Sequence, residues 1–562
     1  MRSWILGSSL LLASTTHALP EISISKRDKG TNGASDHSAS SVNAITKRQN
    51  SNGGTVGTDV FDVLSWSFGG AYYANITVGT PSQSQTVILD TGSSDLYFDA
   101  SSAQTCQLPA TASNSCQGGT FNPKNSSTYN VVDQSPAFNT TFGDGSTAVG
   151  PYASDVVGIG DVLVSPVQFG VADVVNSTTG YSIGLMGIGY SSNEAVQSRS
   201  DFYPNMPEIL KDAGVINSRL YSIWLNDERS TSGTILFGGI DRSKYTGTLA
   251  TVDFLPPLYD GQILNTVNQF ITTVTGCNAT VSGKTTALWS GGSPDYHAYG
   301  SRDASLPVLL DTGSTAWSIP TTYYTAITRL FSYIDARTGI TSCANANTGD
   351  YLSLEFGGKV VIHVDVSQFV VPIVNATTRK PILYDTKGDA ACAFLLQPSE
   401  ESDMGFDVLG DAILRSMYVV FDLDNGQASI AQAVQNSTKQ PDIVTVKAGP
   451  TGVAAAVGSG VATAASNTWS IAAQVSSMPY SVSTAHSTIG TATGNAAVPA
   501  GAQVIQSGSS DSSGGGSGSG SGSGSTSSGA AAGVVIPNAD FTPIWITGLW
   551  IAGVALGFGV MM

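Results

Sequence analysis

Apolar residues recur through the middle of the chain in short runs that turn residues separate. Between about residues 58 and 435, Gly, Asn, Asp and Pro interrupt apolar or alternating runs such as "YYANITVG", "TILFGGI" and "KVVIHVDV". Short runs bounded in this way are typical of β-strands and hairpins. Helical spacing is scarce, and its best examples are two short segments, 207–214 and 321–331. The pattern predicts a mainly β protein.

The first residues combine a positive charge with a short apolar run. Arg2 is followed by "WILGSSLLLA" and then by small residues around Ala18. This arrangement is typical of a secretory signal peptide, and the run is too short to span a membrane. We therefore expect residues 1–18 to be removed and the chain to be secreted.

A polar, turn-rich segment over 19–48 follows and ends in Lys47-Arg48. A basic pair in a secreted chain is typical of a processing site, so we expect a short pro-segment that is cut after Arg48. Lys26-Arg27 is a competing site, and both pairs are also compatible with ordinary surface charge.

Length and charge limit the classes of protein that fit. At 562 residues the chain is longer than one ordinary core supports, so we expect an N-terminal lobe over 49–250 and a C-terminal lobe over 251–440. Only 12% of residues are charged, and the formal net charge is −17. No basic patch is available to neutralise phosphates, which excludes nucleic acid as a partner.

The composition changes after about residue 440. Ala, Ser, Thr, Gly and Val dominate 447–535. Such a sequence is unsuited to a packed core, so we expect a flexible, O-glycosylated stalk over 441–530.

An apolar tail ends the chain. Residues 541–562 are long enough to span a bilayer, yet no basic residue follows them. Small residues, a short spacer and an apolar tail are typical of a GPI-attachment signal. We expect 531–562 to be removed and the anchor to be attached at Gly529, with Ser528 or Ala530 as alternative sites. A tail-anchored membrane span is the other interpretation.

Export makes the five cysteines candidates for disulfides. Cys106 with Cys116 would close a small loop, and Cys343 with Cys392 a larger one, but one sequence does not prove the pairing; Cys277 is left over.

Sequons support export as a set, and they predict N-glycosylation at Asn75, Asn125, Asn139, Asn176, Asn278, Asn375 and Asn436.

One stretch occurs twice. "VILDTGSSDLYF" begins at residue 87 and "VLLDTGSTAWSI" at residue 308, so Asp90 and Asp311 both follow three apolar residues. A single Asp-Thr-Gly is ordinary turn chemistry. Two copies with matching flanks, about one lobe apart, predict a duplicated lobe with one acid from each copy.

These motifs resemble those of the pepsin-like aspartic proteases over about residues 70–435. Leu185-Met186-Gly187 and Val408-Leu409-Gly410 are similar to the family's segments that thread beside each aspartate loop. The resemblance implies a mainly β, bilobal pepsin-like fold with the active site between two related β lobes. Both cysteine pairs also fall where the family has loop-closing disulfides.

The resemblance also assigns roles. Asp90 and Asp311 would be the catalytic pair, and support would come from Thr91, Gly92, Ser93, Thr312, Gly313 and Ser314. Gly92 and Gly313 allow close approach of the two loops, the threonines brace the opposite loop, and the serines donate to the carboxylates. The resemblance implies acid-active peptide hydrolysis through a water activated by two carboxyls that share one proton, with no metal, cofactor or covalent intermediate.

"TFGDGSTAVG" at 141–150 is similar to the family's flap, the hairpin that closes over the substrate. The family usually has Tyr where this chain has Phe142, and Trp where it has Tyr97. The bond between that Trp and Tyr therefore cannot form. We expect Tyr97 to pack beneath Phe142 and the flap to be less firmly latched, although a harmless exchange of aromatic residues is also compatible.

Asp144 follows Gly143 at the expected flap tip. Some fungal members carry an acid here and accept basic residues on the amino side of the cut bond. A flap carboxylate facing Lys or Arg would form a charge-assisted hydrogen bond, so we expect a preference for basic residues. The alternative is that Asp144 only favours the turn.

The signal, basic pair, sequons, stalk and GPI-like tail together resemble the fungal cell-surface branch, the yapsin-type proteases. The sequence therefore predicts a monomeric aspartic endopeptidase that acts on proteins or peptides outside the cell. A catalytically silent pepsin-fold binding protein and a structural cell-wall mannoprotein are the alternatives. Both Asp-Thr-Gly motifs are intact, which favours the enzyme.

Overall fold

The computed structural model describes most of the region between residues 54 and 463. The described ranges are 54–63, 71–109, 115–178, 181–196, 201–230, 233–259, 262–263, 266–290, 305–373, 380–385, 387–399, 405–458 and 461–463. The predicted signal peptide and pro-segment with Arg48, most of the stalk, the tail signal with Ser528, Gly529 and Ala530, and the sequon at Asn375 lie outside these ranges.

The largest sheet among the described residues has 14 strands, which come from both halves of the chain. In spatial order these are β34 (Val461–Thr463), β17 (Tyr245–Asp253), β32 (Gln427–Ala433), β31 (Met417–Asp422), β14 (Leu220–Trp224), β15 (Gly233–Phe237), β1 (Val56–Val63), β2 (Ala71–Val78), β3 (Gln83–Asp90), β13 (Gly184–Gly187), β4 (Leu96–Asp99), β10 (Val162–Ala172), β9 (Tyr152–Ile159) and β6 (Asn130–Val132).

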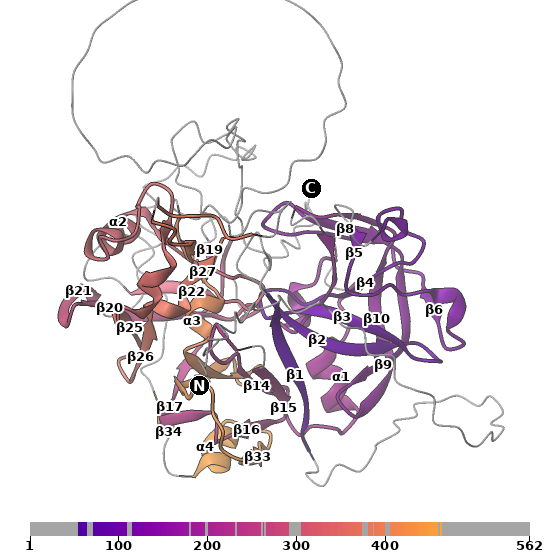
Figure 1. The fold of residues 1–562 in the computed structure, drawn as a ribbon. Helices are drawn as coiled ribbons and strands as arrows, with labels where there is room; N and C mark the ends of the chain where they lie inside the picture. Colours follow the sequence, from indigo (N-terminus) through magenta and orange to yellow (C-terminus); the bar gives the residue numbers. More distant parts are fainter. Residues whose placement is uncertain are drawn as a thin grey trace, which may run out of the picture. The chain divides into compact units, whose positions relative to one another are not determined.

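A second sheet of eight strands belongs to the C-terminal half. Its members are β26 (Val360–Asp365), β25 (Tyr351–Phe356), β20 (Ile271–Val281), β22 (Leu306–Leu310), β30 (Asp407–Leu409), β23 (Trp317–Pro320) and β29 (Leu396–Ser399), with β21 (Lys284–Ser290) paired to β20. Figure 1 shows the strands of this sheet in pink and orange, apart from the indigo and purple strands of the first half.

Small sheets and short helices complete the described fold. The small sheets are β11 (Val174–Asn176), β8 (Thr147–Gly150) and β7 (Phe138–Thr141); β24 (Ile340–Ser342), β28 (Ala391–Phe394) and β27 (Val370–Pro372); β12 (Tyr181–Ser182) with β5 (Ser115–Cys116); β16 (Gly239–Asp241) with β33 (Ile443–Thr445); and β18 (Leu258–Tyr259) with β19 (Gln262–Ile263). The α-helices of the described region are α1 (Met206–Asp212), α2 (Thr321–Leu330), α3 (Asp411–Leu414) and α4 (Gly452–Val457). The mainly β prediction and both predicted helical segments are confirmed.

The two halves are joined through the large sheet. Strand β14 pairs antiparallel with β31, in the register Tyr221↔Phe421. Phe270 packs against Phe421 with the ring centroids 4.8 Å apart, so aromatic packing supports the pairing. The boundary expected between residues 250 and 251 falls inside β17 of this sheet.

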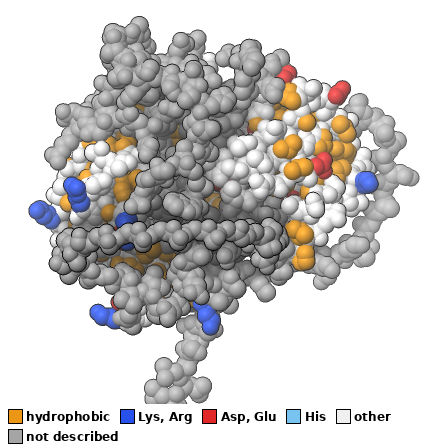
Figure 2. All heavy atoms as spheres, turned by 90° about the horizontal axis from the view of Figure 1, so that it is seen from above, with side chains coloured by type: hydrophobic (Ala, Val, Ile, Leu, Met, Phe, Trp, Pro, Cys, Tyr) orange, Lys and Arg blue, Asp and Glu red, His pale blue; other side chains and the backbone are white. Residues whose placement is uncertain are grey.

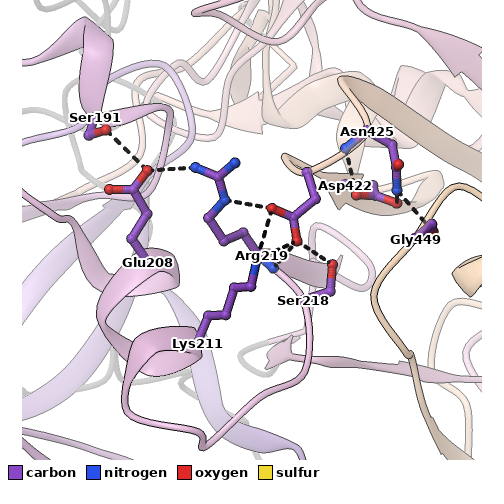
Figure 3. Close-up of polar contacts among 9 residues, drawn as sticks. Ser191, Glu208, Lys211, Ser218, Arg219, Asp422, Asn425 and Gly449 are labelled. Carbon is purple, nitrogen blue, oxygen red and sulfur yellow. Dashed lines mark hydrogen bonds and ion pairs between the residues drawn. The ribbon is translucent and has the colours of Figure 1, made fainter.

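An ion-pair network also crosses between the halves. Arg219 donates to Glu208 on α1 at 2.8 Å and to Asp424, in the β31–β32 turn, at 2.6 Å (Figure 3). Lys211 adds a contact of 3.2 Å to Asp424. Burial alone would raise the pKa of Asp424, but the hydrogen bonds from Arg219, Ser218 and Lys211 lower it to about 2. The carboxylate therefore stays ionised in moderately acidic solution.

The C-terminal segment differs from the sequence prediction at its beginning. The stalk was expected to start at residue 441, but β33 pairs with β16 and β34 pairs with β17. Val446 and Val453 are buried in a cluster with Trp224 and Tyr418. The segment still offers apolar Val side chains, and these cover a face of the large sheet that includes Trp224 and Tyr418.

Four of the five cysteines form two disulfides. These join Cys106 to Cys116 and Cys343 to Cys392, with Cα–Cα distances of 4.7 and 5.0 Å. Cys277 is a buried free thiol. None of the helices within these residues is long and apolar enough to cross a membrane.

Candidate active site

The two repeated motifs form matching structures. Asp90 is the last residue of β3, and Asp311 directly follows β22. Strand β13 runs parallel to β3, with Gly187 opposite Asp90, and β30 runs parallel to β22, with Leu409 opposite Leu310. Both inserted strands also pair antiparallel with the strand that follows the aspartate loop, β4 or β23. The predicted threading of both segments is confirmed.

Glycine is required where each threaded segment passes the aspartate loop. A Cβ atom on Gly187 would lie 2.5 Å from the backbone nitrogen of Ser94, and a Cβ on Gly410 would lie 2.5 Å from the backbone oxygen of Ser314. Both distances are too short for a side chain, because the clashing atoms belong to the backbone. The apolar-apolar-Gly pattern therefore has a steric cause in both halves.

Each carboxyl group is held by its own turn. Gly92 donates its backbone N–H to Asp90 Oδ1 at 2.7 Å, and Ser93 Oγ donates to Asp90 Oδ2. In the second half, Gly313 donates its N–H to Asp311 Oδ1 at 2.8 Å. Ser314 Oγ donates to Asp311 Oδ2 at 2.9 Å. The side chains of Asp90 and Asp311 are both fully buried.

The threonines connect the two turns reciprocally. The Thr91 N–H donates to Thr312 Oγ1 at 3.1 Å, and the Thr312 N–H donates to Thr91 Oγ1 at 2.9 Å. Thr91 Oγ1 then donates to the Leu310 carbonyl and Thr312 Oγ1 to the Leu89 carbonyl, both at 2.8 Å. Four hydrogen bonds thus fix one loop against the other in a buried environment.

Burial and the neighbouring carboxyl group together shift the pKa of each aspartate. Burial raises the pKa of Asp90, and hydrogen bonds from Ser93, Asp311 and Gly92 oppose this rise. Burial raises the pKa of Asp311 well above its usual range, and the charge of Asp90 raises it further. Two adjacent buried carboxyls cannot both ionise cheaply, so the pair retains a proton at acidic pH. Such a pair can both accept and donate a proton.

Comparison with known proteins agrees with this geometry. The sequence model of the family described as eukaryotic aspartyl protease matches residues 71–433, more than half of the chain. The chain belongs to this family. It is accordingly an aspartic-type endopeptidase, with the mainly β, bilobal fold that its sheets form.

Several fungal proteins are similar to this aspartyl protease. A probable aspartic-type endopeptidase opsB of Aspergillus fumigatus is 35% identical over 393 residues, which cover 68% of this chain and 73% of the relative. An acid protease of Saccharomycopsis fibuligera is 35% identical over 366 residues, or 64% and 80% of the two chains. Secreted aspartic protease 3 of Candida albicans is 32% identical over 369 residues, or 64% and 79%.

The segment that resembles the flap of an aspartyl protease forms a hairpin. Strands β7 and β8 pair through Thr141↔Thr147, and residues 142–146 form the tip. The Phe142 N–H donates to the Ser146 carbonyl at 2.8 Å, and Gly145 has a positive φ of 84° that suits glycine. Gly143 and Asp144 lie half-buried at the tip.

Tyr97 packs against the flap through its ring. Its centroid lies 6.0 Å from that of Phe142 and 5.7 Å from that of Phe138. The Tyr97 hydroxyl points to the Ile183 carbonyl, at 3.4 Å. The expected aromatic contact between Tyr97 and Phe142 is therefore present, and the hydroxyl turns to the backbone of another segment.

Asp95, Glu194 and Tyr203 form a buried polar cluster that the sequence analysis did not predict. Asp95 accepts hydrogen bonds from the Tyr203 hydroxyl at 2.6 Å and from the Ala195 N–H at 2.8 Å. Glu194 accepts from the Tyr203 N–H at 3.0 Å. Burial raises the pKa of Asp95 to about 6 and that of Glu194 to about 10. Asp95 was within the repeated motif, but no sequence signal connected it with residues 100 positions later.

Within the described ranges, one group of residues has side-chain types that can bind a metal ion. Asp99 lies close to Cys106 and Cys116. Their sulfurs are bonded to each other and so are not available as thiolates. This group does not form a metal centre while the disulfide is intact.

The sequons within the described ranges lie at or near the surface. Asn278 is half-buried, and the exposed ones are Asn75, Asn125, Asn139, Asn176 and Asn436. Asn139 is in β7 and Asn176 is in β11, so two of them belong to the sheet that contains the flap.

Proposed function

We propose that Asp90 and Asp311 hydrolyse peptide bonds as a catalytic pair at acidic pH. The observation that carries the proposal is the pair of fully buried carboxyls on two turns that Thr91 and Thr312 bond together, each carboxyl supported by equivalent Gly and Ser donors. The ionised member takes a proton from a water molecule, whose oxygen attacks the scissile carbonyl. The protonated member donates to the carbonyl oxygen. The tetrahedral intermediate collapses as the leaving nitrogen gains a proton.

Cleavage of a denatured protein at acidic pH tests this proposal. We expect the processed wild-type protein to cleave it, and pepstatin or Asp90→Asn to abolish cleavage. Loss of activity with retained folding, measured by circular dichroism, would assign the effect to the pair. If the processed wild type shows no such activity, the chain is a pepsin-fold binding protein instead.

We also propose that the enzyme is a secreted, glycosylated zymogen of the yapsin-like branch that is held at the cell surface by a GPI anchor. The supporting observations are the apolar start, Lys47-Arg48, the exposed sequons, the Ser/Gly-rich segment and the apolar tail. The Candida albicans relative carries the name of a secreted protease. We propose that the enzyme is a monomer and that its pro-segment is cut off after Arg48.

Cell-surface release tests the anchor. A phospholipase specific for phosphatidylinositol should release the enzyme from intact cells, and a chain that ends at Ala530 should appear in the medium without treatment. If full-length protein resists the phospholipase and is extracted only by detergent, a membrane-spanning tail is present instead.

We further propose that Asp144 favours basic residues next to the cut bond. It lies at the flap tip, where its carboxylate could pair with a Lys or Arg side chain of the substrate. Wild type should cleave a Lys peptide with a higher kcat/KM than a matched Leu peptide, and this difference should disappear in Asp144→Asn. An equal loss on both peptides would show that Asp144 acts on the flap alone.

A further inference from the structure

The flap tip is held by a polar cluster of Asp144, Ser146 and Thr178. Asp144 Oδ1 accepts from the Ser146 N–H at 2.8 Å, and Asp144 Oδ2 accepts from Ser146 Oγ at 2.7 Å. These two bonds are local to the turn. The Thr178 hydroxyl also donates to Asp144 Oδ2, and the Thr178 N–H donates to Ser146 Oγ at 3.0 Å.

Thr178 belongs to a different segment of the chain, more than 30 residues away from the tip. It follows β11, which pairs with the flap strand β8 through Val174↔Val149, Val175↔Ala148 and Asn176↔Thr147. Both the strand pairing and the Thr178 contacts therefore connect the flap to the same neighbouring segment. The backbone bonds hold the base of the hairpin, and Thr178 reaches its tip.

We propose that Thr178 is a positioning residue that clasps the flap through Asp144 and Ser146. The inference rests on the proposed peptidase function, because its consequence is measured on substrate binding. The flap ring at Phe142 has no hydroxyl with which to bond to Tyr97, so aromatic packing alone lacks a directional fastening. The clasp provides one, since a carboxylate accepts hydroxyl donors with defined geometry.

The clasp should affect substrate affinity more than the chemical step. A preordered flap has less conformational freedom to lose when substrate binds. This advantage is common to the bound substrate and the transition state, so its loss raises KM while kcat is preserved. For one charge-assisted bond at an exposed site, we expect KM to rise roughly threefold to tenfold.

Three variants separate the clasp from glycosylation. Thr178→Val removes the hydroxyl but also destroys the sequon of Asn176. Asn176→Gln destroys the sequon and keeps the hydroxyl, and Thr178→Ser keeps both. We expect the rise in KM only for Thr178→Val, with kcat within about twofold of wild type. Amide exchange over residues 142–148 should be faster in that variant, because the tip opens more often.

Ser146→Ala provides a second route to the same test, including the case in which Thr178→Val fails to fold. It removes the hydroxyl that both Asp144 and Thr178 contact. The double variant Thr178→Val/Ser146→Ala should raise KM by no more than about the larger of the two single effects, because both substitutions disrupt the same hydrogen-bonded cluster.

Specific results would overturn the clasp. An unchanged KM and unchanged exchange in both Thr178→Val and Ser146→Ala would do so, as would the same rise in Asn176→Gln. The effect should be equal on Lys and Leu peptides, which distinguishes it from a direct charge effect of Asp144. An inactive wild type would refute the proposed peptidase function, and the exchange measurement would then still decide whether the clasp exists.

Discussion

Thr91 and Thr312 occupy equivalent positions and bond to each other across the junction of the two halves. Each hydroxyl accepts from the opposite backbone N–H and donates to a backbone carbonyl before the opposite aspartate. Since both side chains are buried, water cannot replace a lost partner. The distance between the carboxyls therefore depends on these two hydroxyls.

Thr312→Val should reduce both stability and activity. It leaves the Thr91 N–H and the Leu89 carbonyl without this hydroxyl, so we expect the free energy of unfolding to fall by about 2 kcal/mol. We expect kcat/KM to fall by at least about tenfold, because the carboxyls lose their fixed separation. Denaturant unfolding and peptide cleavage measure the two effects. Thr273→Val is the control, since the buried Thr273 hydroxyl has no hydrogen-bond partner within the described region.

At the scale of elements, the segment from β33 to β34 covers a face of the sheet that joins the halves. Its contacts include the β16–β33 and β17–β34 pairings and an ion pair between Arg242 and Asp442 at 2.8 Å. Trp224 and Tyr418 line the apolar surface beneath it. This segment therefore belongs to the folded enzyme, and any stalk begins after it.

A chain that ends at residue 440 should be less stable than one that ends at residue 463. Burial of Val446 and Val453 contributes about 1.5–3 kcal/mol each, and truncation exposes the surface that they cover. We expect a lower melting temperature for the shorter chain and no difference between the longer chain and the full enzyme. Equal melting temperatures for both truncated chains would contradict a structural role.

At the scale of the whole molecule, several carboxyls are buried within the described residues. The face in Figure 2 carries only scattered charged side chains on the described residues. Burial raises the pKa of Asp95 to about 6, of Asp99 to about 7 and of Glu194 to about 10. The ion-paired Asp424, with its pKa lowered to about 2, behaves in the opposite way.

These shifts predict greater stability in acid than at neutral pH. The folded protein keeps the three carboxyls protonated at pH values where the unfolded chain has released their protons, near pH 4. Their favourable contribution is complete below that pH and is lost as the pH rises through the folded pKa values. Asp424 stabilises the fold at pH values above its unfolded pKa, and this stabilisation is lost as the pH falls through its folded pKa of about 2. Melting temperature should therefore be highest at about pH 3–4 and fall toward pH 7.

Glu194→Gln isolates one part of this dependence. Gln resembles the protonated Glu and does not titrate. Between pH 4 and pH 7 the free energy of unfolding should therefore fall by about 1–3 kcal/mol less in the variant than in wild type. Melting temperature measured across this range, with the exposed Asp133→Asn as the control, checks the expectation. A wild type that is more stable at pH 7 than at pH 4 would contradict it.

The sequence by itself determined the strand-rich class, the duplicated Asp-Thr-Gly motif and the glycines that thread beside it. Those features are local or repeat in the chain, and their steric and hydrogen-bonding demands can be read from residue type. Only the tertiary structure decided what Thr178, Asp95 and Val446 contact. Their partners lie tens to hundreds of residues away, and a lone Thr, Asp or Val carries no local pattern that names a distant partner. Long-range packing alone made the first part of the expected stalk a part of the fold and gave the flap tip its fastening.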